Sequence, residues 1–229
     1  MFIQKKDKMN KLPFPKAVLF DFDGVIVDSK NCHMSAWSSA FKEIFNKEIC
    51  DFPEATHAGR APYQIANYFA EFGGDITKGE ELNTLKQSHI LATQTPPGLL
   101  PGVHEIQGFL AKNNIPHGIA SNAYTAFVEN SLRQTGANFS ICMGVDMFSK
   151  PKPSPVPYLT LAKHLGVAEK DFSSTLIFED SLTGIRAAAA TGMVAVGLTT
   201  QYSKEELLAN GAVKVFPTLL EAYQEIVSL

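Results

Sequence analysis

The sequence predicts an α/β protein with a doubly wound, Rossmann-like core on a parallel sheet and an inserted all-helical cap. Short apolar runs without polar alternation recur along the chain, which is typical of strands buried on both faces of a parallel sheet. Most of these runs are followed by a turn and a helical pattern, as in a doubly wound fold. One long stretch, residues 30–97, shows helical patterns alone.

The predicted core strands are short and apolar. The first covers residues 17–20 and leads directly into Asp21; the others are 115–120, 139–143, 175–178, 193–196 and 213–216. Helical patterns lie between or after the later runs, at 124–134, 158–165, 183–191, 204–210 and 219–227. Strands and helices therefore alternate in the order that a doubly wound sheet requires.

The insert contains helical patterns at 33–45, 62–72 and 80–93. It ends in residues 95–102, where prolines and glycines interrupt regular structure. We therefore predict an α/β core of residues 16–29 and 98–229, with a helical cap of residues 30–97. The linkers near Asp28 and Ser29 and at 95–101 are the expected hinges of this cap.

Residues 1–15 are predicted to be a flexible N-terminal extension. The first sixteen residues include five lysines and lack the apolar segment of a secretory signal. Met1 and Met9 are both candidate start sites.

Composition excludes several classes of protein. Hydrophobic residues make up 45% of the 229 residues, charged residues 19%, and the net charge is −3, which is ordinary for a soluble globular protein. This balance gives no reason to expect a nucleic-acid partner, and the longest apolar stretch, 187–198, is too short to span a membrane. Three cysteines without a CxxC motif indicate reduced thiols in the cytoplasm. A monomer is favoured, although the sequence does not define the oligomeric state.

Polar residues stand at the ends of four predicted strands, where ligands bind in open α/β sheets. Asp-x-Asp-Gly is by itself common in turns, and an Asp-Ser pair is as typical of a helix cap. Their combination at successive strand ends favours a functional site. The groups are Asp21 and Asp23, then Ser121 and Asn122, then Lys150 in a proline-stiffened loop, then Glu179 and Asp180.

These four motifs, in this order, resemble the signature of the haloacid dehalogenase superfamily. The residues 25–29 and the helical insert are similar to the branch that contains β-phosphoglucomutase and phosphoglycolate phosphatase. The resemblance spans residues 16 to about 200, nearly the whole chain.

The resemblance implies a role for each motif. Asp21 is the nucleophile that forms an aspartyl-phosphate, and Asp23 is the general acid and then the general base. Mg²⁺ is the implied cofactor, held by Asp21, Asp180 and the backbone carbonyl of Asp23, with Glu179 bound directly or through water. The hydroxyl of Ser121 and the backbone amide of Asn122 hold the phosphoryl group. Lys150 neutralises the nucleophile, and Lys152 is assigned to the surface.

Two cap residues are weaker candidates. His33 and Trp37 are four residues apart on one helical face. A packing pair is the favoured interpretation; docking of the cap near Asp23 and a contact from His33 to the substrate are the alternatives. Arg60 is either a substrate contact or a solvated loop arginine.

An acid at position 23 points to phosphate esters as substrates. The phosphoglucomutase relatives have an arginine three residues after a glycine of the insert and a lysine after the Ser motif, where this chain has Pro62 and Tyr124. Both differences remove cations that would hold a second phosphate. We therefore predict a phosphatase for a small phosphorylated metabolite, with a sugar phosphomutase as the second candidate. The candidate from another class is a catalytically silent module that binds a phosphorylated ligand.

Overall fold

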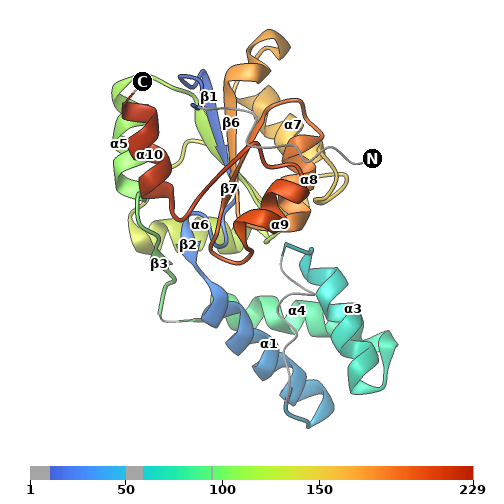
Figure 1. Cartoon of the computed structure of the whole chain (residues 1–229). Helices are drawn as coiled ribbons and strands as arrows, with labels where there is room; N and C mark the ends of the chain where they lie inside the picture. The colour runs from blue at the N-terminus through green and yellow to red at the C-terminus, as the bar shows by residue number, and fades with distance from the viewer. Residues whose placement is uncertain (1–10, 50–58, 94, 229) are drawn as a thin grey trace, which may run out of the picture.

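Residues 11–49, 59–93 and 95–228 are described by the structure, a computed structural model. Six parallel strands form one sheet in the order β5-β4-β1-β6-β7-β8, with helices on both faces (Figure 1). This arrangement confirms the predicted α/β class. The strands are β1 (Ala17–Phe20), β4 (His117–Ala120), β5 (Cys142–Met143), β6 (Thr175–Glu179), β7 (Val194–Leu198) and β8 (Lys214–Phe216).

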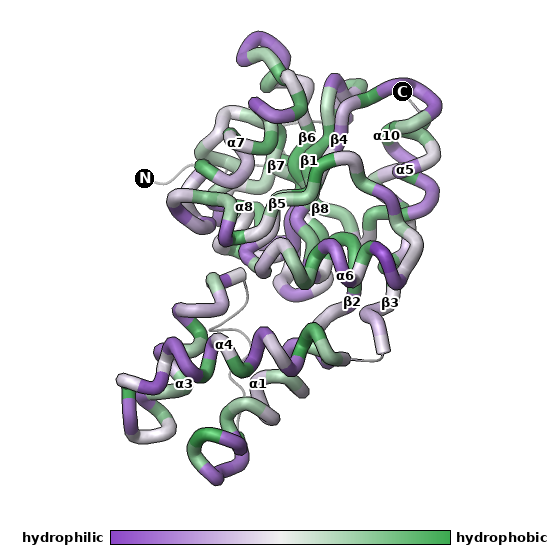
Figure 2. Tube along the Cα trace, turned by 180° about the vertical axis from the view of Figure 1, so that it is seen from behind, coloured by the Kyte–Doolittle hydropathy of each residue, from purple (hydrophilic) through white to green (hydrophobic). Residues whose placement is uncertain are grey.

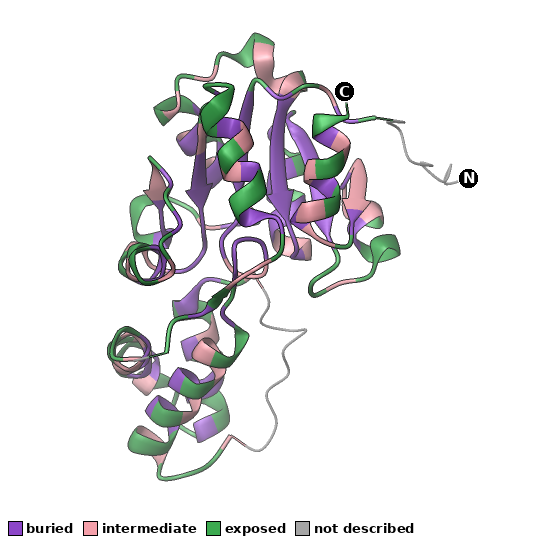
Figure 3. Ribbon diagram, turned by 90° about the vertical axis from the view of Figure 1, so that its left-hand side faces the viewer, coloured by how far each residue is buried: buried purple, intermediate pink, exposed green. Residues whose placement is uncertain are grey.

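Each face of the sheet has its own apolar layer. Successive residues of a strand point to opposite faces, so Val18 and Phe20 pack on one side and Ala17 and Leu19 on the other. The first layer is packed by α5 (Val103–Lys112), α6 (Thr125–Thr135) and α10 (Leu219–Val227), and the second by α7 (Val156–His164) and α8 (Leu182–Ala189), with α9 (Lys204–Ala209) beside α8. Figure 2 shows the hydrophobic strands between more polar helices, and Figure 3 shows the buried sheet between partly exposed helices.

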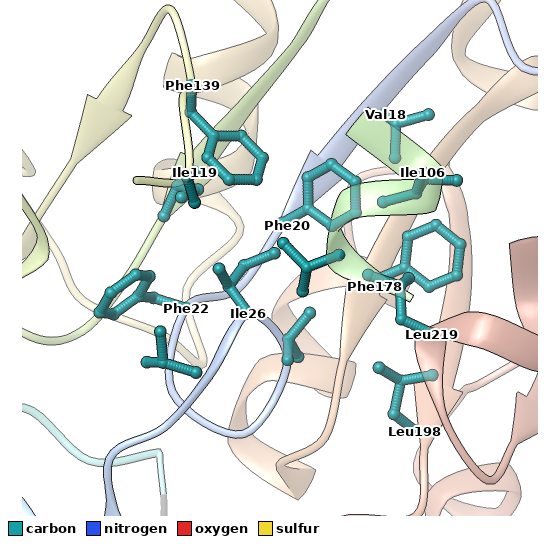
Figure 4. Packing of buried hydrophobic residues seen from close by; sticks show 14 of the residues in the cluster. Val18, Phe20, Phe22, Ile26, Ile106, Ile119, Phe139, Phe178, Leu198 and Leu219 are labelled. Atoms are coloured by element: carbon teal, nitrogen blue, oxygen red, sulfur yellow. The ribbon is translucent and has the colours of Figure 1, made fainter. Parts of the chain in front are cut away.

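Aromatic rings fill the first layer. Phe20 in the central strand β1 stacks on Phe178 of β6 at 5.6 Å between ring centroids and meets the edge of Phe139 at 5.6 Å (Figure 4). Phe20 and Phe178 also oppose each other in the β1–β6 register. The ends of β1 and β6 are therefore fixed by packing as well as by backbone hydrogen bonds.

Some elements of the core differ from the prediction. Helix α5 was not predicted, and β5 contains only Cys142 and Met143 of the expected strand at 139–143. Phe139 precedes this strand and packs on Phe20, so its apolar character reflects burial in a loop. Of the helices in the described ranges, none is long and apolar enough to cross a membrane.

The insert has a separate hydrophobic core. It contains α1 (Lys30–Phe45), α3 (Pro62–Gly73), the short 3₁₀ helix η1 (Ile76–Lys78) and α4 (Gly79–Leu91), and its described residues include no strand. Trp37, Phe41 and Phe69 pack together away from the sheet. In Figure 1 these helices lie below the core, next to the loops that carry the site. We call residues 30–97 the cap.

The two linkers between core and cap pair with each other. Strands β2 (Val27–Asp28) and β3 (Gly98–Leu99) form a two-stranded antiparallel ribbon. The chain therefore leaves and re-enters the core at one place, next to the predicted hinges.

The predicted flexible extension is wrong for part of its length. Leu12 is buried in the core, and its backbone N–H donates to Oε1 of Glu225 at 2.8 Å. Leu12 lies between Lys11 and a Pro-Phe-Pro segment, so its tertiary contact left no periodic signal. Residues 1–10, with the candidate start Met9, lie outside the described residues.

We predict that Phe20→Ala lowers the free energy of unfolding by about 3–5 kcal/mol, because truncating a buried aromatic ring leaves a cavity. Urea denaturation measures this change. Met147→Ala is the control, since Met147 is 50% exposed and the expected change is within about 0.5 kcal/mol. Equal destabilisation by the two variants would contradict the assigned packing.

Candidate active site

The carboxyl edge of the sheet brings the predicted polar residues together. Asp21 follows β1, Ser121 follows β4, and Glu179 is the last residue of β6. These strands are parallel neighbours, so their ends meet at the same edge. A pocket of about 540 Å³ opens there; core residues lining it include Asp21, Asp23, Ser121, Lys152 and Asp180, and cap residues lining it include His33, Arg60 and Lys86.

The cation next to Asp21 is Lys152, which corrects the assignment to Lys150. The Lys152 ammonium lies 2.6 Å from Oδ1 of Asp21 and 2.6 Å from Oε1 of Glu179, and its side chain is 2% exposed. Lys150 is exposed. Both lysines precede prolines in the sequence Lys150-Pro-Lys-Pro, so spacing alone did not distinguish them.

Hydrogen bonds from Asn122 hold the loop that carries Lys150 and Lys152. Oδ1 of Asn122 accepts the backbone N–H of Lys152 at 3.0 Å, and its Nδ2 donates to the Lys152 carbonyl at 3.3 Å. These bonds fix the backbone of Lys152 two residues beyond Lys150. Lys152 rather than Lys150 therefore reaches the site because Asn122, a residue that follows another strand, binds its backbone. The local sequence around the two lysines does not contain this information.

Tyr158 is a site residue that the sequence analysis did not identify. Its hydroxyl accepts the ammonium of Lys152 at 2.8 Å and donates to Oε1 of Glu179 at 2.5 Å. The Lys152 ammonium also lies 4.5 Å from the centre of the Tyr158 ring. Tyr158 is in α7, six residues after Lys152. Its role became visible only in the structure, where α7 packs next to the site.

Three buried carboxylates form a cluster suited to a divalent cation. One oxygen each from Asp21, Glu179 and Asp180 lies within 4.8 Å of the others. Among the described residues, Oδ1 of Asp180 is a buried side-chain oxygen without a hydrogen-bond partner. Clustered carboxylate oxygens are the ligands that Mg²⁺ prefers, so these residues fit that ion.

The two aspartates have more free oxygens than Glu179. Oε1 of Glu179 accepts from Lys152 and Tyr158. Its Oε2 accepts from the backbone N–H groups of Asp180 and Ser181 and from the Ser181 hydroxyl, at 3.1 to 3.3 Å. This engagement favours Asp21 and Asp180 as the direct ligands, with Glu179 acting through water.

The pKa values of both aspartates in the cluster are raised. Burial, reinforced by the Glu179 carboxylate, raises the pKa of Asp21 to about 7, even though Lys152 opposes the shift. Burial and the charges of Asp21 and Glu179 hold the pKa of Asp180 well above its usual range. Three carboxylates and a single ammonium leave excess negative charge, which these pKa shifts reduce.

Asp23 lies in a different electrostatic environment. Its Oδ1 accepts the Ser29 hydroxyl and lies 3.1 Å from Nε2 of His33, while Nδ1 of His33 lies 3.0 Å from the Lys86 ammonium. Burial acts to raise the pKa of Asp23, but His33 and Ser29 outweigh it and the pKa falls below its usual value. His33 and Lys86 both come from the cap, so the cap completes the surroundings of Asp23.

Lys86 was not predicted, because a lysine on a polar helix is usually solvated. Its side chain is instead 1% exposed, and its ammonium lies 5.2 Å from the Trp37 ring. Burial lowers its pKa to about 8. The two residues of the predicted His33–Trp37 pair therefore differ in role. Trp37 packs in the hydrophobic core of the cap, and His33 contacts Asp23 in the α/β core.

Gly24 allows the first strand-end loop to approach the acid cluster. Its φ is +75°, and a Cβ there would lie 1.9 Å from Oδ2 of Asp180. The hydroxyl of Thr200 donates either to that oxygen, at 2.9 Å, or to the Gly24 carbonyl, at 2.7 Å. A side chain at position 24 would therefore displace Asp180.

The remaining predicted residues also line the pocket. Ser121 is buried, and its hydroxyl oxygen accepts the backbone N–H of Ala123 at 2.9 Å. Asn122 is buried beside it, and Arg60 is an exposed cap residue at the pocket.

The family of the chain follows from comparison with known proteins. The profile described as "Haloacid dehalogenase-like hydrolase" matches residues 18–198, and the chain belongs to this family. The match includes all four strand-end motifs and the whole cap. It confirms the predicted resemblance.

Named relatives include both phosphatases and phosphomutases. A validoxylamine A 7'-phosphate phosphatase from Streptomyces hygroscopicus subsp. limoneus is 28% identical over 84% of this chain and 89% of its own. A β-phosphoglucomutase from Bacillus subtilis is 31% identical over 80% and 83%, respectively. The crystal structure of a hydrolase from Pseudomonas syringae has the same fold, with a TM-score of 0.78 and 22% identity over 93% and 98%. The chain is thus a phosphate-ester enzyme of this hydrolase family, as predicted.

We predict that the metal-free protein loses thermal stability as pH rises from about 4 to 7. Asp21 has a folded-state pKa of about 7, against 3.8 for an aspartate free in water, and the shift of Asp180 has the same sign. In this window the folded state binds more protons than the unfolded chain, so unfolding becomes easier as pH rises. Mg²⁺ competes with these protons and is expected to raise the melting temperature more at pH 8 than at pH 5.

Differential scanning fluorimetry after chelation, across a millimolar Mg²⁺ series, measures both effects. Asp180→Asn is expected to weaken the Mg²⁺ shift, because it removes the carboxylate that has an unpartnered oxygen. A melting temperature that does not change with Mg²⁺ concentration at either pH would contradict the metal site.

We predict that Lys152→Met lowers phosphate release from an aryl phosphate by about 10²–10³-fold, the usual effect of losing one preorganised group that stabilises developing charge. Lys150→Met is the matched control and is expected to retain activity. Since Lys152→Met leaves buried carboxylates without their cation, rates are compared per folded protein. Loss of activity in the Lys150 variant alone would favour Lys150 as the cation of the site.

Proposed function

We propose that the chain is a Mg²⁺-dependent phosphatase that hydrolyses a small phosphorylated metabolite through an aspartyl-phosphate. The observation that carries this proposal is the Asp21 carboxylate at the end of β1, 2.6 Å from the buried ammonium of Lys152 and clustered with Asp180. A carboxylate in this position can attack phosphorus, and the adjacent cation stabilises the charge that develops there.

The first half-reaction transfers the phosphoryl group to Asp21. The carboxylate oxygen of Asp21 forms a bond to phosphorus, the bond from phosphorus to the ester oxygen breaks, and Asp23 gives a proton to the leaving alcohol. Ser121 and the backbone amide of Asn122 hold the transferred group. In the second half-reaction Asp23 accepts a proton from water, which attacks phosphorus and releases phosphate and the free carboxylate of Asp21.

Bound Mg²⁺ would supply positive charge to the phosphoryl oxygens. We propose that Asp21, Asp180 and the backbone carbonyl of Asp23 hold it, with Glu179 acting through water. The free oxygen of Asp180 supports this set, as does the engagement of both Glu179 oxygens.

The cap supports a small substrate. The pocket of about 540 Å³ lies within the range of small-molecule sites, and a cap seated over it excludes bulk water during phosphoryl transfer. His33 positions Asp23 from the cap, and we propose Arg60 as a contact to the substrate. Cytoplasmic location and a monomeric state stay predictions from the sequence.

The second candidate is a sugar phosphomutase, favoured by the 31% identity to a β-phosphoglucomutase. A mutase must hold a second phosphate. Pro62 lines the pocket at the position where those relatives have an arginine. Tyr124 stands where they have a lysine, and its uncharged hydroxyl accepts a hydrogen bond from the side-chain amide of Asn83 at 2.9 Å. These two positions support hydrolysis over phosphoryl return.

The deciding experiment compares the wild type with Asp21→Asn on an aryl phosphate and a panel of sugar phosphates, phosphoglycolate and nucleotides, each with Mg²⁺. We predict that the wild type releases phosphate and that the variant loses about 10⁴-fold or more, as expected for removal of a covalent nucleophile. Activity in both proteins would remove Asp21 from the nucleophile role.

Two further outcomes separate the alternatives. Formation of glucose 6-phosphate from β-glucose 1-phosphate, faster than phosphate release, would make the chain a mutase. Binding of phosphorylated ligands without turnover of any substrate would favour the silent binding module.

A further inference from the structure

The side chain of Asn122 makes three hydrogen bonds, two within the core and one to the cap. Two hold the backbone of Lys152, through Oδ1 at 3.0 Å and Nδ2 at 3.3 Å. The third and shortest runs from Nδ2 to the carbonyl of Gly59 in the cap, at 2.7 Å. Both amide protons and the carbonyl oxygen of this buried side chain are therefore engaged.

Gly59 fits closely between two strand-end loops of the core. On one side its carbonyl meets Asn122. On the other side a Cβ at position 59 would lie 2.6 Å from Oγ of Ser181. Its φ is +73°, a conformation that L side chains rarely adopt. The cap thus approaches the core here through a backbone that leaves no room for a side chain.

Both neighbours of Gly59 are connected to Lys152. Asn122 holds its backbone. Ser181 donates its hydroxyl to Oε2 of Glu179 at 3.1 Å, and Oε1 of Glu179 accepts the Lys152 ammonium at 2.6 Å. One cap residue therefore bonds to Asn122 and lies next to Ser181, the two side chains that lead, from opposite sides, to the cation next to Asp21.

We propose that Asn122 is a positioning residue that couples the seating of the cap to the placement of the Lys152 ammonium at Asp21. This inference rests on the proposed phosphatase function. When Gly59 leaves, the Asn122 side chain loses its shortest bond. It is then held only by its two bonds to the Lys152 backbone, so side chain and loop are free to shift together. The nucleophile is therefore fully neutralised only when the cap is seated and bulk water is excluded.

The main test is Asn122→Asp, which keeps the shape and the acceptor for the Lys152 N–H but replaces the Nδ2 donor by an oxygen. Two carbonyls then face a carboxylate, so we expect the cap to unseat and kcat to fall at least about 10-fold. Spin labels at the exposed positions Ile76 in the cap and Met147 in the core, with the native cysteines replaced, report cap seating by electron–electron distance measurement.

Tyr124→Phe is the matched control. It removes another hydrogen bond between cap and core, from Asn83 to the Tyr124 hydroxyl, which does not touch Lys152. We expect this variant to broaden the label distances and raise KM while kcat is kept, whereas Asn122→Asp lowers kcat as well. Equal loss of kcat in both variants would reduce Asn122 to a general cap contact and overturn the inference.

A double-mutant cycle provides the second test. Gly59→Ala adds a Cβ next to Ser181, so we expect it to lower kcat alone and to cause little further loss in the Asn122→Asp background, because both changes break one contact. Additive losses would overturn the coupling. Absence of phosphate release by the wild type would defeat the proposed function, whereas label distances unchanged by Asn122→Asp would defeat this inference alone.

Discussion

The buried contact between Lys152 and Asp21 is the interaction on which the site depends. Removing a carboxylate and an ammonium from water is costly unless each finds a partner of opposite charge, and here the ammonium serves Asp21 and Glu179 at the same distance. Asp180 has no such cation among the described residues. The cluster therefore has more negative charge than the protein neutralises, and this excess is what a divalent cation would compensate.

The parallel sheet makes this concentration of charge feasible. Neighbouring strands in register, with Phe20 opposite both Ile119 and Phe178, deliver the residues that follow them to one edge within a few ångströms. The rings below that edge are fully buried, so the strand ends are rigid where the charges repel one another. A less tightly packed core would relieve the repulsion by moving the carboxylates apart.

The sequence predicted what is encoded locally. Buried strands appear in a single chain as short apolar runs, and amphipathic helices as a periodic pattern. Asp21, Asp23, Glu179 and Asp180 are adjacent to strand ends that the apolar runs locate. The choice between Lys150 and Lys152 was not predictable in this way, because the Asn122 side chain decides it from thirty residues away. The buried positions of Lys86 and Tyr158 likewise depend on which helix returns to the site.

Asp23 shows how the cap enters the chemistry. Its carboxylate has a lowered pKa because His33 and Ser29 contact it, which suits a base that accepts a proton from water but opposes the earlier role as an acid. A phosphate dianion arriving next to it adds negative charge and raises its pKa again, so substrate binding itself favours the protonated form. In the proposed mechanism the alcohol then takes that proton and leaves, and His33, 3.1 Å from the carboxylate, would stabilise its ionised form for the hydrolytic step. Because His33 belongs to the cap, the proposed mechanism would need a seated cap for the return of Asp23 to its basic form as well as for the exclusion of water.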